Sequence, residues 1–250
     1  MQKTFVMLAA LLIAGLAFVG CKSSGSGDAN GSGGECGSGA CSSSCSGGSS
    51  TDMADMMIKM YTDGQQKASP FVALHSFVSV GQYWEVTSNF GGQESVNKWQ
   101  VTAKAKGTKS EFIVENDMGM GYILAYQVDS WAEAGKPNVK KAWIGKTGEE
   151  PQEIEVMEWE ATTGGNAPAF NGIVLKEDFK AVKMAGKDFD GELVIVKSDG
   201  NTTKTWTAEN GWFSKVIKME MNGDVVMELT GVSFDEKVEA WLKWEADEKK

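Results

Sequence analysis

From residue 83 to residue 232 the chain repeats one unit, a short segment of alternating or β-branched and aromatic residues followed by residues that favour a turn. Alternation with a period of two is typical of a strand that buries one face. The turns include Gly91-Gly92 and Asn222-Gly223-Asp224, and Asn-Gly is favoured in tight hairpins. The predicted strands cover residues 83–90, 99–106, 111–116, 122–129, 139–145, 154–159, 179–185, 192–197, 202–208, 213–221 and 225–232.

Short turns join antiparallel neighbours, because parallel strands need a long crossover between them. We therefore predict a mainly β (α+β) fold, a curved antiparallel sheet or half-barrel of about eleven strands. Such a sheet must bury one face. Helical spacing predicts an N-terminal Met-rich helix from residue 51 to Gly64 and a C-terminal helix over residues 234–246, so the sheet is expected to pack on these two helices.

The N-terminal helix carries Met53, Met56, Met57 and Met60 on one stripe. Methionine is flexible and fills gaps, so such a stripe commonly packs a helix on its core. A surface for copper or for adaptable apolar partners is the alternative. A second short apolar segment, residues 71–74, predicts one or two further helical turns.

The first 21 residues have the organisation of a bacterial export signal. Lys3 provides the positive charge, and residues 5–19 form an apolar stretch that is short for a membrane span. The end, Phe18-Val19-Gly20-Cys21, resembles the bacterial lipobox, with Phe18 where that pattern prefers leucine. The resemblance implies a diacylglycerol on Cys21, cleavage before it and acylation of the new N-terminus. An ordinary secretory signal followed by an unmodified cysteine is the alternative.

A lipid anchor predicts a protein exported and attached to the cell envelope, since acyl chains hold a protein at a membrane through about 0.8 kcal/mol per buried methylene. Lys22 is not the aspartate associated with inner-membrane retention. In a cell with two membranes we therefore expect the outer membrane, facing the periplasm. The expected organisation is a signal peptide at 1–20, the lipidated cysteine and a linker at 21–50, and one globular β-rich domain at 51–250.

Residues 22–50 consist mainly of glycine, serine and other small residues, which cannot form a core and so predict a flexible tether. Cys36, Cys41 and Cys45 lie inside it. Their spacing matches no common zinc, haem or iron–sulfur pattern. Disulfide formation in an oxidising compartment is favoured, with one cysteine left for an intermolecular bridge. A soft-metal or redox clip is the alternative.

The charges exclude several classes of function. The formal net charge is −10, and every cationic side chain other than histidine is a lysine. An acidic chain without guanidinium groups is a poor nucleic-acid ligand. His75 is the only histidine, and we interpret it as structural. A serine hydrolase would have to use it as its base, and no Gly-x-Ser-x-Gly elbow is present. We expect no enzyme, no cofactor and no metal site, although a pair of carboxylates brought together by folding stays open.

Four segments carry a family resemblance: Val80-Gly81-Gln82-Tyr83-Trp84-Glu85-Val86, Ala185-Gly186-Lys187-Asp188-Phe189, Thr203-Lys204-Thr205-Trp206 and Val216-Ile217-Lys218-Met219-Glu220-Met221. They resemble a group of bacterial envelope lipoproteins and periplasmic proteins of uncharacterised activity, similar in outline to the lipoprotein-carrier fold. That resemblance implies a curved sheet closed by helices that shelters acyl chains. The group often has a cysteine where this chain has Asp190, so a paired cysteine is not carried over.

Two functions follow as expectations. In the first, the concave face of the sheet binds an apolar ligand, such as a lipid acyl chain, lined by Trp84, Trp99, Trp143 and Trp206. Packing of these rings into the protein's own core is the alternative for each of them. In the second, the domain is a structural or protein-interaction module that docks on another envelope protein, for example through an edge strand.

Overall fold

The computed structural model describes residues 50–75, 77–133, 135–159, 172–210 and 215–244, in one helix and eleven strands. The helix is α2 (Ser50–Thr62). The strands are β1 (Gln82–Phe90), β2 (Gln93–Lys104), β3 (Glu111–Asp117), β4 (Ile123–Asp129), β5 (Val139–Gly145), β6 (Gln152–Ile154), β7 (Gly172–Met184), β8 (Lys187–Ser198), β9 (Asn201–Ala208), β10 (Val216–Met221) and β11 (Asp224–Phe234). Cys21, Cys36, Cys41 and Cys45, the leader and the tether lie outside the described residues.

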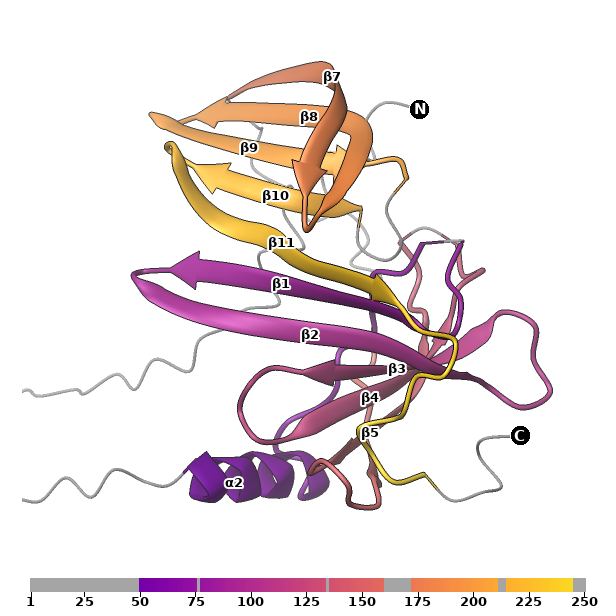
Figure 1. Ribbon diagram of the computed structural model, residues 1–250. Helices are drawn as coiled ribbons and strands as arrows, with labels where there is room; N and C mark the ends of the chain where they lie inside the picture. The colour runs from indigo at the N-terminus through magenta and orange to yellow at the C-terminus, as the bar shows by residue number, and fades with distance from the viewer. Residues whose placement is uncertain (1–49, 76, 134, 160–171, 211–214, 245–250) are drawn as a thin grey trace, which may run out of the picture. The chain divides into compact units, whose positions relative to one another are not determined.

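All eleven strands form one antiparallel sheet in the order β6-β5-β4-β3-β2-β1-β11-β10-β9-β8-β7 (Figure 1). The first and last strands pair at its centre. The chain therefore runs outward from β1 to one edge at β6, and returns from the other edge at β7 to β11. The predicted antiparallel sheet of about eleven strands is confirmed. The Asn222-Gly223 turn has both residues at positive φ, 53° and 96°, as a tight hairpin requires.

The sheet has two faces, which we name after one residue on each. The Trp84 face of β1 to β5 holds most of the larger core cluster. On it, Trp84 lies opposite Trp99, and α2 buries Ala54 and Tyr61 while making its contacts with β5 and β6. The segment after α2 adds Ala68, Val72 and Val78 to the same cluster. The N-terminal Met-rich helix is thus confirmed as a covering element of the β5–β6 end.

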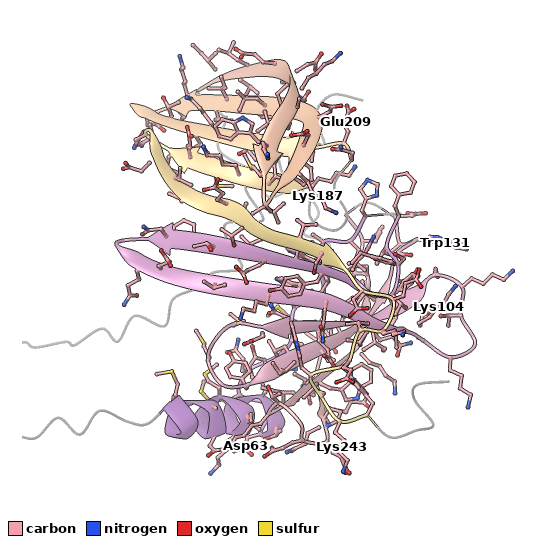
Figure 2. The ribbon with its side chains drawn as sticks, in the orientation of Figure 1. Asp63, Lys104, Trp131, Lys187, Glu209 and Lys243 are labelled. Carbon is pink, nitrogen blue, oxygen red and sulfur yellow. The ribbon has the colours of Figure 1, made fainter. Side chains whose placement is uncertain are left out.

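The Glu115 face is covered by residues 235–244, which we call the strap. Leu242 and Trp244 of the strap pack on Ile113, Ile123 and Trp143. The rings of Trp143 and Trp244 meet edge to face, with centroids 5.2 Å apart. Lys243, labelled in Figure 2, is exposed at the end of the strap. Both faces of the β2–β5 part of the sheet are therefore covered.

The predicted C-terminal helix is wrong for the described residues up to 244, which contain no helix there. The backbone groups of the strap bond to the sheet and its loops instead of to one another. The amides of Trp241 and Leu242 donate to the Glu115 carboxylate, and that of Lys243 donates to the Glu149 carbonyl. The carbonyl of Trp241 accepts from Gly148. Helix formation would break these bonds, since a helix uses the same groups internally.

The helical turns predicted for residues 71–74 are also absent. The Asn138 side chain instead forms hydrogen bonds with the backbone of this segment. Its Oδ1 accepts from the amide of Val72 at 2.9 Å, and its Nδ2 donates to the carbonyl of Val72 at 2.6 Å. These two bonds tie the backbone of Val72 to the residue before β5, and the Val72 side chain is buried in the core. The strand predicted over 154–159 lies earlier in the chain, at β6 (Gln152–Ile154), so only Ile154 of the prediction is in a strand.

Candidate apolar binding surface

Two adjacent rows of uncharged side chains cross the sheet on the Trp84 face, one from β8 to β10 and the other from β8 to β11. In one row Val196 pairs with Thr203 and Thr203 with Met221. In the next row Val194 pairs with Thr205, Thr205 with Met219 and Met219 with Met227. We call these seven side chains the neutral face: Val194, Val196, Thr203, Thr205, Met219, Met221 and Met227. Met219 is buried and the other six are at least partly exposed, Met221 at 37%.

Strands β9 and β10 carry their charged side chains, Lys204, Lys218 and Glu220, on the Glu115 face. Glu220 lies between two lysines there, 2.9 Å from Lys218 and 3.6 Å from Lys204. The Nζ of Lys218 also stands 5.1 Å from the ring centroid of Trp206. In β9 and β10 the charges therefore lie on one face, the usual alternation of an antiparallel sheet, whereas β8 also carries Glu192 on the Trp84 face.

The neutral face, however, has little cover from the described elements. The main contacts of α2 are with β5 and β6, near the far edge of the sheet from β8 and β9 (Figure 1). The six partly exposed side chains are aliphatic, thioether or hydroxyl groups, and charges lie only at their border. Lys176 of β7 lies opposite Val194 and pairs with Glu192 at 2.8 Å, and Asp224 lies opposite Met221. Contiguous exposed apolar surface of this kind commonly marks a binding site.

The neutral face continues toward an aromatic stack at the centre of the sheet. Met227 lies opposite Ser88 of β1, and Trp84 lies two alternations further along that strand. The rings of Trp84 and Trp99 stack at 5.4 Å with an interplanar angle of 8°, and Tyr126 follows at 6.2 Å. Trp84 is buried, whereas Trp99 is partly exposed.

Two phenols in this region report the apolarity of their surroundings. Burial raises the pKa of Tyr122 to about 12 and also raises the pKa of Tyr126, because the ionised form is poorly solvated there. Both phenols are therefore neutral at physiological pH. The Trp84 face is thus uncharged from Tyr126 across Trp99 and Trp84 to the neutral face.

The four tryptophans predicted to line one cavity divide between the two faces. Trp84 and Trp99 come together on the Trp84 face. Trp143 lies on the opposite face, buried against Trp244. Strand register places Trp206 on that face too, beside Lys218, where it packs against the β8–β10 part of the larger core cluster. The structure therefore retains Trp84 and Trp99 beside the candidate surface and separates Trp143 and Trp206 from it. Sequence reasoning missed the neutral face, whose signal is a pair of uncharged residues at alternate positions in each of three strands: 194 and 196, 203 and 205, 219 and 221.

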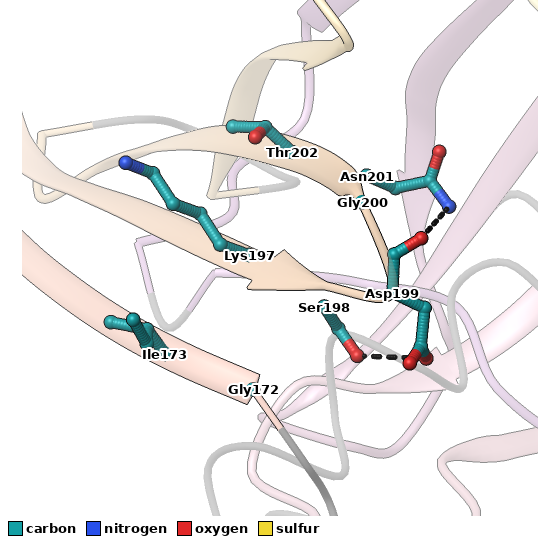
Figure 3. Close-up of a pocket in the computed structure, with 8 residues that line it drawn as sticks. All are labelled: Gly172, Ile173, Lys197, Ser198, Asp199, Gly200, Asn201 and Thr202. Atoms are coloured by element: carbon teal, nitrogen blue, oxygen red, sulfur yellow. Dashed lines mark hydrogen bonds between the residues drawn. The ribbon is translucent and has the colours of Figure 1, made fainter.

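A second feature is an open cavity of about 450 Å³ at the β8–β9 hairpin (Figure 3). Its lining includes Lys197, Ser198, Asp199 and Asn201. The polar atoms that line it serve the turn: Ser198 Oγ donates to the Asp199 carboxylate and Asn201 Nδ2 donates to the Asp199 carbonyl. The cavity is therefore part of hairpin geometry and offers weaker support for a ligand than the neutral face.

His75 is buried and packed. Its ring stacks on that of Phe77 at 4.5 Å, and its Nδ1 accepts a hydrogen bond from the Phe77 amide. Burial, together with the charge of Lys215, lowers the pKa of His75.

Among the described residues no group of three or more His, Cys, Asp or Glu side chains is arranged to hold a metal ion. None of the helices in that part of the chain is long and apolar enough to cross a membrane.

Comparison with known proteins identifies no family for this chain. No protein family matches the chain, and neither does any curated protein. Among solved structures, one of PNGF-II in space group C2 has 12% identity over 66% of this chain, with a TM-score of 0.24. The chain spans about 30% of the length of that protein. A likeness this distant carries no inference about fold or function, so the candidate site rests on its own geometry.

Proposed function

We propose that this chain is an exported lipoprotein, anchored in the membrane through Cys21, that binds an apolar ligand such as a lipid acyl chain against the neutral face. It acts by binding and not by catalysis. One observation carries the proposal: six partly exposed, uncharged side chains form adjacent rows on the face of the sheet that is buried elsewhere. The lipobox-like sequence before Cys21 supports the anchor.

The energetics of such binding are adequate. Each methylene transferred from water to an apolar surface contributes about 0.8 kcal/mol, so the roughly fourteen methylenes of a palmitoyl chain supply about 11 kcal/mol. Part of this offsets the loss of translational and conformational freedom. A dissociation constant in the micromolar range, about −8 kcal/mol, is therefore within reach. A charge introduced into the neutral face opposes it, because a buried unpaired ammonium is strongly disfavoured.

Val196 and Ile195 provide a matched pair for this test. They are neighbours on β8, both partly exposed, and their side chains point to opposite faces. We expect Val196→Lys to weaken binding of a dansylated fatty acid by about tenfold or more, since it places an ammonium in the contact. Ile195→Lys should leave the affinity within about twofold. The measurement is saturable enhancement of dansyl fluorescence by the unlipidated Cys21→Ser chain.

Circular dichroism on both variants checks that the strand is intact. No saturable signal from the parent chain at micromolar protein would sink the proposed ligand class. Equal loss in both variants would show that the probe reads sheet integrity and not contact with the neutral face.

The anchor has a test of its own. Cys21→Ser removes the sulfur that is expected to carry the diacylglycerol, and cleavage and N-terminal acylation are expected at the same cysteine, so the exported chain should move from the membrane fraction to the soluble fraction. Two or three acyl chains attach a protein stably to a membrane, and a chain without them lacks this affinity. Fractionation with mass spectrometry of the N-terminal peptide measures this. An unmodified Cys21 in the parent protein would remove the anchor from the proposal.

A protein-interaction module is the second candidate, supported by the edge strand β7. Ile173 and Leu175, near its start, are 60% and 43% exposed, and β7 ends the described sheet. Exposed edges with apolar residues favour addition of a strand from another chain. Recovery of one stoichiometric envelope protein with the parent chain, lost on Leu175→Lys but kept on Val196→Lys, would favour this function over ligand binding.

A further inference from the structure

Four methionines of α2 occupy a narrow arc of the helix. Met53, Met56, Met57 and Met60 stand at positions i, i+3, i+4 and i+7. With about 3.6 residues per turn, they fall within an arc of about 100°. The arc does not coincide with the buried face: Ala54, Ile58 and Tyr61 are centred about 110° away around the helix. The methionines therefore run along one flank of α2, at the border between core and solvent.

Packing explains only part of this stripe. Met57, nearest to the buried face, contacts the larger core cluster. Met53 and Met56 are 53% and 55% exposed, and Met60 is partly buried. The opposite flank of the helix is fixed differently, by the ion pair between Asp55 and Lys146. Two thioethers one turn apart are thus in solvent beside a third, without a packing role to account for them.

The chemistry of the stripe suits a soft cation. Side chains three and four apart on a helix have Cβ atoms about 5–6 Å apart, and the three flexible torsions of methionine let such sulfurs converge. Thioether ligands select Cu(I) among the biological metals. They carry no proton to lose on binding, and they do not form disulfides in the oxidising compartment where such a lipoprotein resides. Hard cations, which prefer oxygen ligands, are not favoured here.

From this geometry we propose that α2 binds one soft monovalent metal ion, Cu(I) or its analogue Ag(I), through the sulfurs of Met53, Met56 and Met60. The step is coordination alone, with no change of oxidation state. This site lies on α2 and is separate from the neutral face, so each proposal stands or fails without the other.

The tether cysteines would bind Cu(I) themselves, so the test uses the full chain with Cys21, Cys36, Cys41 and Cys45 all replaced by serine. Cu(I) is titrated anaerobically against the chromogenic chelator bicinchoninate. We expect one equivalent bound, with sulfur as the only ligand type in X-ray absorption spectra. In the same background the Met53→Leu/Met56→Leu variant should bind Cu(I) at least about tenfold more weakly, since two of three ligands are gone.

Leucine retains the helix propensity and the apolar volume of methionine, so the fold should persist and circular dichroism will verify it. The control removes two exposed methionines elsewhere, Met157→Leu/Met221→Leu, which are 50% and 37% exposed in the parent. It should bind like the parent. Absence of stoichiometric Cu(I) in the cysteine-free parent overturns the proposal. So does equal weakening in both double variants, because that outcome assigns binding to scattered thioethers.

Discussion

Replacing Glu115 by alanine should lower the free energy of unfolding by about 3–5 kcal/mol, the range for breaking a buried charged network. Glu115 has 0% exposure, and its carboxylate accepts four hydrogen bonds. Gln100 Nε2 donates at 2.9 Å and Trp244 Nε1 at 2.8 Å, while the amides of Trp241 and Leu242 donate at 2.6 and 3.3 Å. Alanine leaves the three donors of the strap without this acceptor, whereas Gln100 Nε2 also donates to the Glu239 carbonyl at 3.2 Å. Each buried donor that loses its acceptor is costly.

The strap should detach before the sheet melts, because three of the four donors belong to it. Urea denaturation followed by far-ultraviolet circular dichroism gives the loss of stability. A red shift of tryptophan emission at low urea reports exposure of Trp241 and Trp244. Glu177→Ala is the matched control, an exposed glutamate on β7 whose loss should change stability by less than about 0.5 kcal/mol. A loss below about 1 kcal/mol for Glu115→Ala would refute the idea that the Glu115 carboxylate holds the strap on the sheet.

Strand positions were predictable from the sequence because each strand carries its own alternation and its own turn residues. The pairing of Trp84 with Trp99 was equally accessible in principle. Both residues lie seven positions from the two-residue Gly91-Gly92 turn, and a tight hairpin aligns such positions. Local information of this kind fixes both register and face.

The faces of Trp143 and Trp206 were not predictable in that way. Long connections join β4 to β5 and β9 to β10, and these two pairings carry register shifts, one between Gln127 and Val128 and another between Val216 and Lys218. A single inserted residue moves a side chain to the other face, and alternation alone does not locate it. A cavity lined by all four tryptophans was therefore beyond what spacing can establish.

The strap escaped prediction for a different reason. Val238, Trp241 and Leu242 recur at helical spacing, yet the amide of Trp241 bonds a carboxylate 126 positions away in the chain. A buried acceptor on the sheet outweighs a weak local helix preference, because intrinsic propensities differ by only about 0.7 kcal/mol per residue among ordinary residues. Long-range polar partners of this kind leave no pattern in the strap's own sequence.

Substitution of Gly81 by alanine should destabilise the domain by about 3 kcal/mol or more, since it combines backbone strain with a steric clash. Gly81 has a φ of +96°, and a Cβ there would lie 2.3 Å from the carbonyl oxygen of Asp235. That contact cannot relax easily, because the Gly81 amide donates to Val101 and its carbonyl accepts from Asp235, both at 2.9 Å. These bonds join the start of β1 to β2 and to the end of β11.

A comparison with Gly223 separates the backbone strain from the steric clash. Gly223 has the same φ of +96°, but nothing lies within 4 Å of a Cβ built on it. Gly223→Ala should therefore show the backbone strain alone, about 1–2 kcal/mol. Urea unfolding of both variants measures the difference, which isolates the close approach of Asp235. The close approach would be refuted by equal losses at the two positions. An excess at Gly81 would explain why a glycine stands directly before the opening strand: the backbone beginning the strap passes too near for any side chain.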